Sequence, residues 1–193
     1  MPNNRLGVAL AGAASLVVAL GAVVLPAHAD TCPASTTCST TVSFTVTAQN
    51  GLTIAVPDVP ANIGGGVPGN QISGPLGAIT VTDQRAALAA TWTASVIAAS
   101  GGFTTGGGTA AETISTADAL YWSGTATTTG TGTFVIGQAD RAAAQSLDVS
   151  RTAYAKTTGS GNNSATWTPN IVINIPAQAV VGTYTGTINH SVA

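Results

Sequence analysis

Segments in which apolar and polar residues alternate strictly recur along this chain, and they constrain its fold more than any other feature. In residues 41–48 the apolar side chains fall on one face and the hydroxyl side chains fall on the other. The segment 181–192 shows the same pattern. Its apolar face holds Tyr184, Ile188, His190 and Val192. A period of two residues is typical of a half-buried β-strand, so the chain is expected to be built from strands.

Further strands are predicted between turn-forming residues. Alternation or short apolar runs mark the segments 52–56, 79–81, 92–96, 119–122, 134–136, 149–155 and 171–175. Loops rich in Gly, Pro and Asn separate them, above all at 62–75 and 100–112. Asn50-Gly51 indicates a tight turn, and Asp140 can cap a short helical turn within 138–147. These patterns predict an all-β fold, an immunoglobulin-like antiparallel β-sandwich with one or two short helical turns.

The beginning of the chain is typical of a secretory signal peptide. Arg5 supplies a positive charge, residues 6–25 are uncharged and apolar, and Ala27-His28-Ala29 has the small-x-small pattern of a cleavage site. Cleavage before Asp30 leaves 164 residues, which we expect to form a single domain over 30–193. The apolar run is long enough to remain as an uncleaved membrane anchor, which is the alternative. After cleavage we expect a secreted protein, extracellular or associated with the cell wall, without membrane contact.

Ionisable side chains are scarce, and this scarcity argues against catalysis. The predicted mature chain keeps four of the five basic residues, the seven acidic residues and one of the two histidines. Charged residues make up 6% of the chain, against about a quarter in typical proteins. General acid–base catalysis and metal binding both depend on such side chains. We therefore expect no enzyme activity, no metal site and no cofactor, and the absence of a basic patch argues against nucleic acid as a partner.

Two cysteines lie close together near the predicted mature N-terminus. In an exported protein, Cys32 and Cys38 are expected to form a disulfide. A free, intermolecular or metal-bound pair is the alternative, although two thiols alone make an incomplete metal site.

Three segments together resemble the WxL surface domain of Gram-positive bacteria. The first runs from Leu76 to Arg85 and is followed by Trp92 and Phe103; the second covers residues 155–167; the third covers residues 170–192 and contains Gly182-Thr183-Tyr184. With the early strand 52–57, the resemblance spans most of residues 42–192. The resemblance rests on the order of these three segments and on the position of the third one at the C-terminal end of the sequence.

The resemblance implies a β-sandwich that attaches non-covalently to the cell wall. The two Trp-x-Leu motifs of that family are changed here, because the corresponding sites read Trp92-Thr93-Ala94 and His190-Ser191-Val192. By position, Trp92 and His190 therefore carry the wall-contact prediction that the resemblance implies.

Other candidate site residues follow from side-chain chemistry. Trp122 and Trp167 border loops, where an exposed indole can stack on a sugar ring, while Trp92 lies in an alternating strand and is expected in the core, with ligand contact as the alternative. Asp83 and Arg85 lie two residues apart and are expected to form a structural ion pair.

Two functions are compatible with these features. The first is a secreted, non-catalytic surface protein whose partner is a cell-wall glycan or another surface protein. The alternative is a structural subunit of a fibre or surface layer that assembles by pairing of strand edges.

Overall fold

The computed structural model describes residues 33–49 and 51–193. Contacts divide the chain into Met1–Phe44 and Thr45–Ala193, and every strand of the described residues lies in the second unit. The predicted signal peptide and Cys32 lie outside the described residues, as does Asn50 of the predicted turn. The disulfide between Cys32 and Cys38 therefore stays a prediction.

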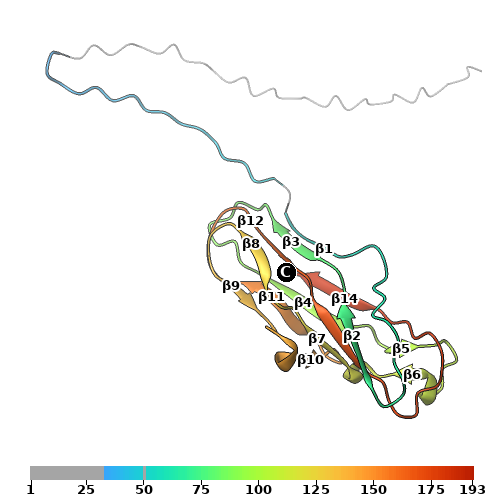
Figure 1. The fold of residues 1–193 in the computed structure, drawn as a ribbon. Coiled ribbons are helices and arrows are strands. Elements are labelled where there is room, and N and C mark those ends of the chain that lie inside the picture. Colours follow the sequence, from blue (N-terminus) through green and yellow to red (C-terminus); the bar gives the residue numbers. More distant parts are fainter. Residues whose placement is uncertain (1–32, 50) are drawn as a thin grey trace, which may run out of the picture. The chain divides into compact units, whose positions relative to one another are not determined.

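The unit Thr45–Ala193 is an all-β antiparallel structure, as the alternation predicted (Figure 1). Its strands are β1 Leu52–Ala55, β2 Gln71–Pro75, β3 Ile79–Asp83, β4 Trp92–Ala98, β5 Phe103–Thr104, β6 Thr113–Ile114, β7 Ala119–Trp122, β8 Ala126–Thr129, β9 Phe134–Ile136, β10 Gln145–Ser146, β11 Arg151–Lys156, β12 Asn163–Trp167, β13 Asn170–Asn174 and β14 Ile188–Val192.

One layer of the sandwich consists of two four-stranded sheets joined end to end. Their strand orders are β1-β3-β12-β8 and β10-β7-β13-β2. Strand β12 leads directly into β13, and the pairing of both neighbours shifts by one residue between them. Pro169 lies in this junction and has no N–H for the ladder. Its carbonyl accepts a 2.9 Å hydrogen bond from the Leu76 N–H, which ties the two halves together.

The opposite layer is a four-stranded sheet of order β14-β4-β11-β9. Strands β5 and β6 pair beside it, and Thr104 of β5 forms a bridge with Thr185, ahead of β14.

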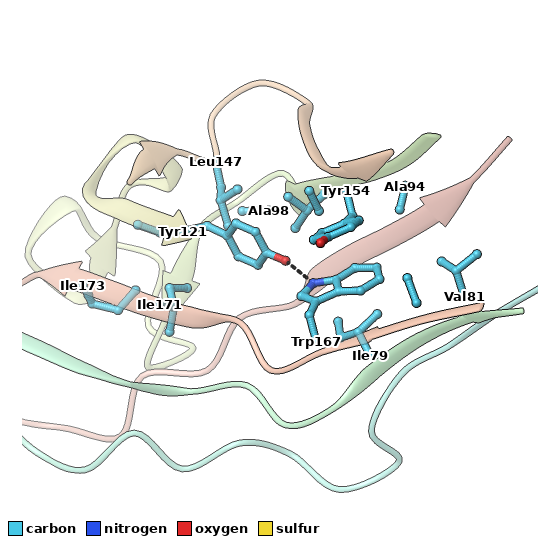
Figure 2. Packing of buried hydrophobic residues seen from close by; sticks show 14 of the residues in the cluster. Ile79, Val81, Ala94, Ala98, Tyr121, Leu147, Tyr154, Trp167, Ile171 and Ile173 are labelled. Carbon is cyan, nitrogen blue, oxygen red and sulfur yellow. Dashed lines mark hydrogen bonds between the residues drawn. The ribbon is translucent and has the colours of Figure 1, made fainter. Parts of the chain in front are cut away.

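The core between the layers centres on Trp167 (Figure 2). The indole stacks on the ring of Tyr154 at a centroid distance of 5.4 Å, and its Nε1–H donates to the Tyr121 hydroxyl at 3.1 Å. Aliphatic residues of neighbouring strands in the same layer, such as Ile79 and Ile171, belong to the same buried cluster. Buried aromatic rings remove large apolar areas from water, which explains why so few of them can support this core.

The part of the chain that the structure describes contains three short 3₁₀ turns: Ala110–Glu112, Thr116–Asp118 and Arg141–Ala143. The last one begins where Asp140 predicted a cap, and the carboxylate accepts hydrogen bonds from the N–H groups of Ala142 and Ala143. The other two were not predicted.

The prediction of a half-buried strand over 41–48 is wrong for this structure. Residues 41–49 form no strand, and their side chains are exposed. Val42, Phe44 and Val46 are 80%, 84% and 77% exposed. The alternation suits a strand, but the described chain supplies neither a partner strand nor a covering layer for it.

Candidate binding groove

The predicted wall-contact tryptophans are mostly in the core. Trp92 is 3% exposed, which confirms its expected place in the core, and Trp167 is 1% exposed, so the expectation that its indole offers a face to a glycan is wrong. Trp167 was predicted to be exposed because it lies next to a loop. It is the last residue of β12, and its side chain points into the core. Trp122 is half-buried and is the one tryptophan for which surface contact stays a prediction.

Trp92 belongs to a buried hydrogen-bonded cluster. Its Nε1–H donates to Asn163 Oδ1 at 2.8 Å, and Asn163 Nδ2 donates to Asp83 Oδ2 at 3.2 Å. The expected ion pair lies in the same cluster, with Arg85 Nε 2.9 Å from Asp83 Oδ1. The hydrogen bond from Arg85 is the main cause that lowers the pKa of Asp83, and it also raises the pKa of Arg85. The cluster joins β3, β4 and β12, and the carboxylate of Asp83 serves to hold these strands together.

Lys156 is a second buried polar residue, and sequence reasoning missed it. Its Nζ donates to the carbonyls of Ala90 and Thr158 at 2.9 Å and 2.8 Å and lies 5.8 Å from the centre of the Phe134 ring. Lys156 follows Tyr154 at a spacing of two on β11, so strand periodicity would have indicated that it points inward.

His190 lies on the inward face of β14, as the alternation predicted. Its ring is 6.0 Å from the ring of Tyr121 by centroids, and Nε2 is buried with no hydrogen-bond partner among the described residues. Burial lowers the pKa of His190 to about 4, so the imidazole is neutral at physiological pH. His190 is half-buried and uncharged, so it offers no charged surface, and the wall contact predicted for it stays a prediction.

His190 instead lines a large apolar groove in the unit Thr45–Ala193. The groove has a volume of about 1240 Å³, which exceeds the roughly 300–1,000 Å³ of a pocket for a drug-sized molecule. Its floor includes Ile72, Ile171 and Ile173 from the first layer. Two chain segments border it, residues 56–68 and residues 179–188.

The border segment 56–68 lies close against the first layer. A Cβ at Gly66 would stand 2.5 Å from Ile72 Cγ2 and 2.6 Å from Ile175 Cδ1, so only glycine fits there without a shift of these side chains. Ile63 similarly covers Gly74 of β2, where an added Cβ would stand 3.0 Å from the Ile63 Cβ. The loop therefore packs beside β2 and covers that side of the groove.

The other border is an open strand edge. Strand β14 forms a hydrogen-bonded ladder only with β4 among the described strands, although β1 of the first layer lies close to it, and Thr185 ahead of β14 forms an isolated bridge with Thr104. Residues 179–188 line the groove without interruption, so the edge of this layer faces the groove. An edge of this kind presents backbone N–H and C=O groups that another strand can pair with.

Apolar side chains are exposed around this groove. Among the described residues there are eleven exposed large hydrophobic side chains, and five of them line the groove: Val56, Val59, Val67, Val180 and Val181. The titratable lining residues are Asp58, Tyr184 and His190, and the Tyr184 hydroxyl already donates within the domain, to carbonyls of Ala111 and Val180. The site is thus a mainly apolar trough, with the carboxyl group of Asp58 in its lining, beside an unpaired strand edge.

The described part of the chain contains no group of three or more His, Cys, Asp or Glu side chains that could hold a metal ion. Within that same part, no helix has both the length and the apolar character needed to cross a membrane.

No family model, curated protein or solved structure matches this chain. The resemblance to WxL surface domains accordingly stays a prediction.

Proposed function

We propose that this protein is an exported, non-catalytic surface subunit that takes part in an assembly by accepting an extended polypeptide segment in its groove. The observation that carries the proposal is the groove itself, an apolar trough with an exposed valine rim next to the free edge of β14. Strand addition at an exposed edge combines backbone hydrogen bonds with pockets for alternate side chains.

The geometry favours a polypeptide over a glycan as the occupant. Glycan recognition would use exposed aromatic faces, and Trp92 and Trp167 are buried in the core. The groove offers mainly aliphatic side chains, which suit the apolar face of a strand. Attachment to the cell wall, which the WxL resemblance implies, would then be a property of the assembly or of the half-buried Trp122.

The test is sedimentation velocity of the purified protein over a range of concentrations, together with co-sedimentation with purified cell walls. We expect assembly that rises with concentration and is lost in the double variant Val67→Asp/Val181→Asp, since both changes place a charge on the exposed groove rim. The matched control is Leu88→Asp, which alters an exposed apolar residue that does not line the groove. Saturable wall binding by a protein that stays monomeric would contradict the proposal.

A further inference from the structure

The exposed apolar side chains of the described structure are concentrated in two places. Five of the eleven line the groove, and three more are Val42, Phe44 and Val46. The latter belong to residues 41–48, which alternate like a strand and yet form none. Single exposed apolar residues are ordinary, but a strand-like row of them indicates a surface that is covered in use.

We propose that residues 41–48 are a donor strand, which lies in the groove of a second copy of this chain and pairs with the free edge of its β14. This assignment rests on the proposed function and names the occupant of the groove.

The chemistry of the segment matches that of the groove. Residues 39–49 contain no ionisable side chain, and the groove is lined mainly by aliphatic residues. In an extended strand Val42, Phe44 and Val46 point to one side and can enter the groove, while Ser43, Thr45 and Thr47 point to the other side. The backbone of the segment can satisfy the unpaired groups of β14, as strand addition requires.

The length of the chain argues for a second copy and against the groove of the same chain. Strand β1 runs toward the groove, because Val56 directly after it and Ile79 at the adjacent end of β3 line the groove, whereas Leu52 pairs with Asp83 at the other end. The preceding segment therefore joins β1 at the end far from the groove. To reach its own groove, the segment would have to reverse over residues 49–51 and run back along all four residues of β1.

The reversed segment would be too short for all its apolar residues. Eight extended residues span about 26 Å at roughly 3.3 Å each, and about half of that length would lie alongside β1. Val46 would remain beside β1, and only Phe44 and Val42 would pass it. A segment from a second copy has no such limit and can bring all three side chains into the groove.

The border segment 56–68 covers the β2 side of the groove, so the donor strand can enter only on the side of β14. Ile63 and Gly66 are packed against the first layer, and this contact covers β2. Residues 179–188 form the uncovered side, and Val181 within them is fully exposed. The donor is therefore expected to contact residues 179–188 more than β2.

The test places a photo-reactive phenylalanine analogue at position 44 in a mixture of isotopically heavy and light full chains. We expect cross-links that join heavy to light chains and map to residues 179–188. Cross-links confined to a single chain would show that the segment folds back on its own domain and would overturn the assignment.

Substitutions give a second readout that separates the donor from the proposed function. Phe44→Asp is expected to reduce self-association by at least tenfold, because a carboxylate cannot enter the apolar groove. Thr45→Asp adds the same charge on the opposite face of the segment and should leave association within about twofold. Assembly that persists in Phe44→Asp would overturn the donor strand while the proposed function stands, and a wild-type chain without assembly or inter-chain cross-links would overturn both.

Discussion

At the scale of the residue, the few polar side chains in the core act as structural connections. Asn163 is the central one, because its amide links Trp92 to Asp83 across the sandwich. Asp83 also accepts a hydrogen bond from Arg85 Nη2, and this nitrogen donates to the Thr91 carbonyl as well, at 2.7 Å. Buried polar groups of this kind stabilise a fold only while each has its partner.

The substitution Asn163→Ala tests this cluster. It removes the acceptor of the Trp92 N–H and a donor to Asp83, and it leaves both groups buried. We expect a loss of about 2–3 kcal/mol in the free energy of unfolding, measured by urea denaturation. The control is Asn189→Ala on the exposed face of β14, which should cost less than about 0.5 kcal/mol. A loss in Asn163→Ala no larger than in the control would contradict the role of the cluster.

The protonation of His190 gives a prediction for pH. Its pKa in the folded protein is about 4, below the roughly 6.5 of an exposed histidine. Between these values the unfolded chain binds the extra proton, so stability falls as pH falls from about 6.5 to 4 and levels off below that range. The neighbouring Tyr121 has a raised pKa and does not titrate there.

Urea denaturation at pH 4 to 8 measures this dependence. We expect the free energy of unfolding to fall by roughly 2–3 kcal/mol toward pH 4, since one pKa unit corresponds to about 1.4 kcal/mol. His190→Phe, which keeps a ring at this position, should flatten the profile above pH 4. Asp83 does not interfere with this measurement. Its pKa is lowered by folding, so its contribution to the free energy of unfolding is lost only as the pH falls below the ordinary value of 3.8. An unchanged slope in the variant would assign the dependence to another group.

Some residue positions could be predicted from sequence and others could not. The spacing of Asp83 and Arg85 and the inward position of His190 follow from the period of a strand. The burial of Trp167 does not follow, because the residue ends its strand beside Pro169 and local pattern does not say which layer covers that end. One partner of Lys156 is the carbonyl of Ala90, which is distant in the sequence, and strand periodicity cannot supply such a contact.

At the scale of the element, the border segment 56–68 shapes the groove through close contact. Gly66 allows the backbone to approach Ile72 and Ile175, which lie on the floor of the groove. Gly65, the residue before it, would meet no atom within 4 Å if it carried a Cβ. Two adjacent glycines thus have different structural roles.

The pair Gly66→Ala and Gly65→Ala tests this difference. The first change should destabilise the fold by about 1–3 kcal/mol, because the new methyl group overpacks the floor of the groove. The second should leave stability within about 0.5 kcal/mol, since its methyl group enters open space. Thermal or urea unfolding of both variants gives the comparison. Equal effects would contradict the close packing of this segment.

Strand prediction succeeded where residues were buried on one face and failed elsewhere. Strands β3, β4 and β14 alternate as expected. Strand β2 was not predicted, because it lies within a segment that was expected to be a loop. Gly74 and Pro75 are turn-forming residues, and Pro75 is the last residue of the strand. Strand β8 is nearly all threonine and has no apolar alternation to detect. In β13, Ile171, Val172 and Ile173 are all buried, so both faces are covered where the pattern predicted one.

At the scale of the whole molecule, the sandwich has an open apolar groove and the chain has an exposed strand-like segment. The sequence predicted a strand over 41–48, and the structure leaves this segment unpaired. Sequence alternation shows that a segment suits a strand, but it does not show which chain supplies the partner. A donor strand reconciles the strong pattern with the absence of a partner within the described chain.

In the proposed assembly, the groove of one copy accepts residues 41–48 of another. The most direct test of this contact is sedimentation velocity of two variants, each alone and in equimolar mixture. Phe44→Asp keeps a working groove and lacks a working donor, whereas Val67→Asp/Val181→Asp keeps a working donor and lacks a working groove. We expect each variant alone to be monomeric and the mixture to form dimers and nothing larger, because only one productive contact is available. A mixture that stays monomeric, or either variant assembling alone, would contradict the claim.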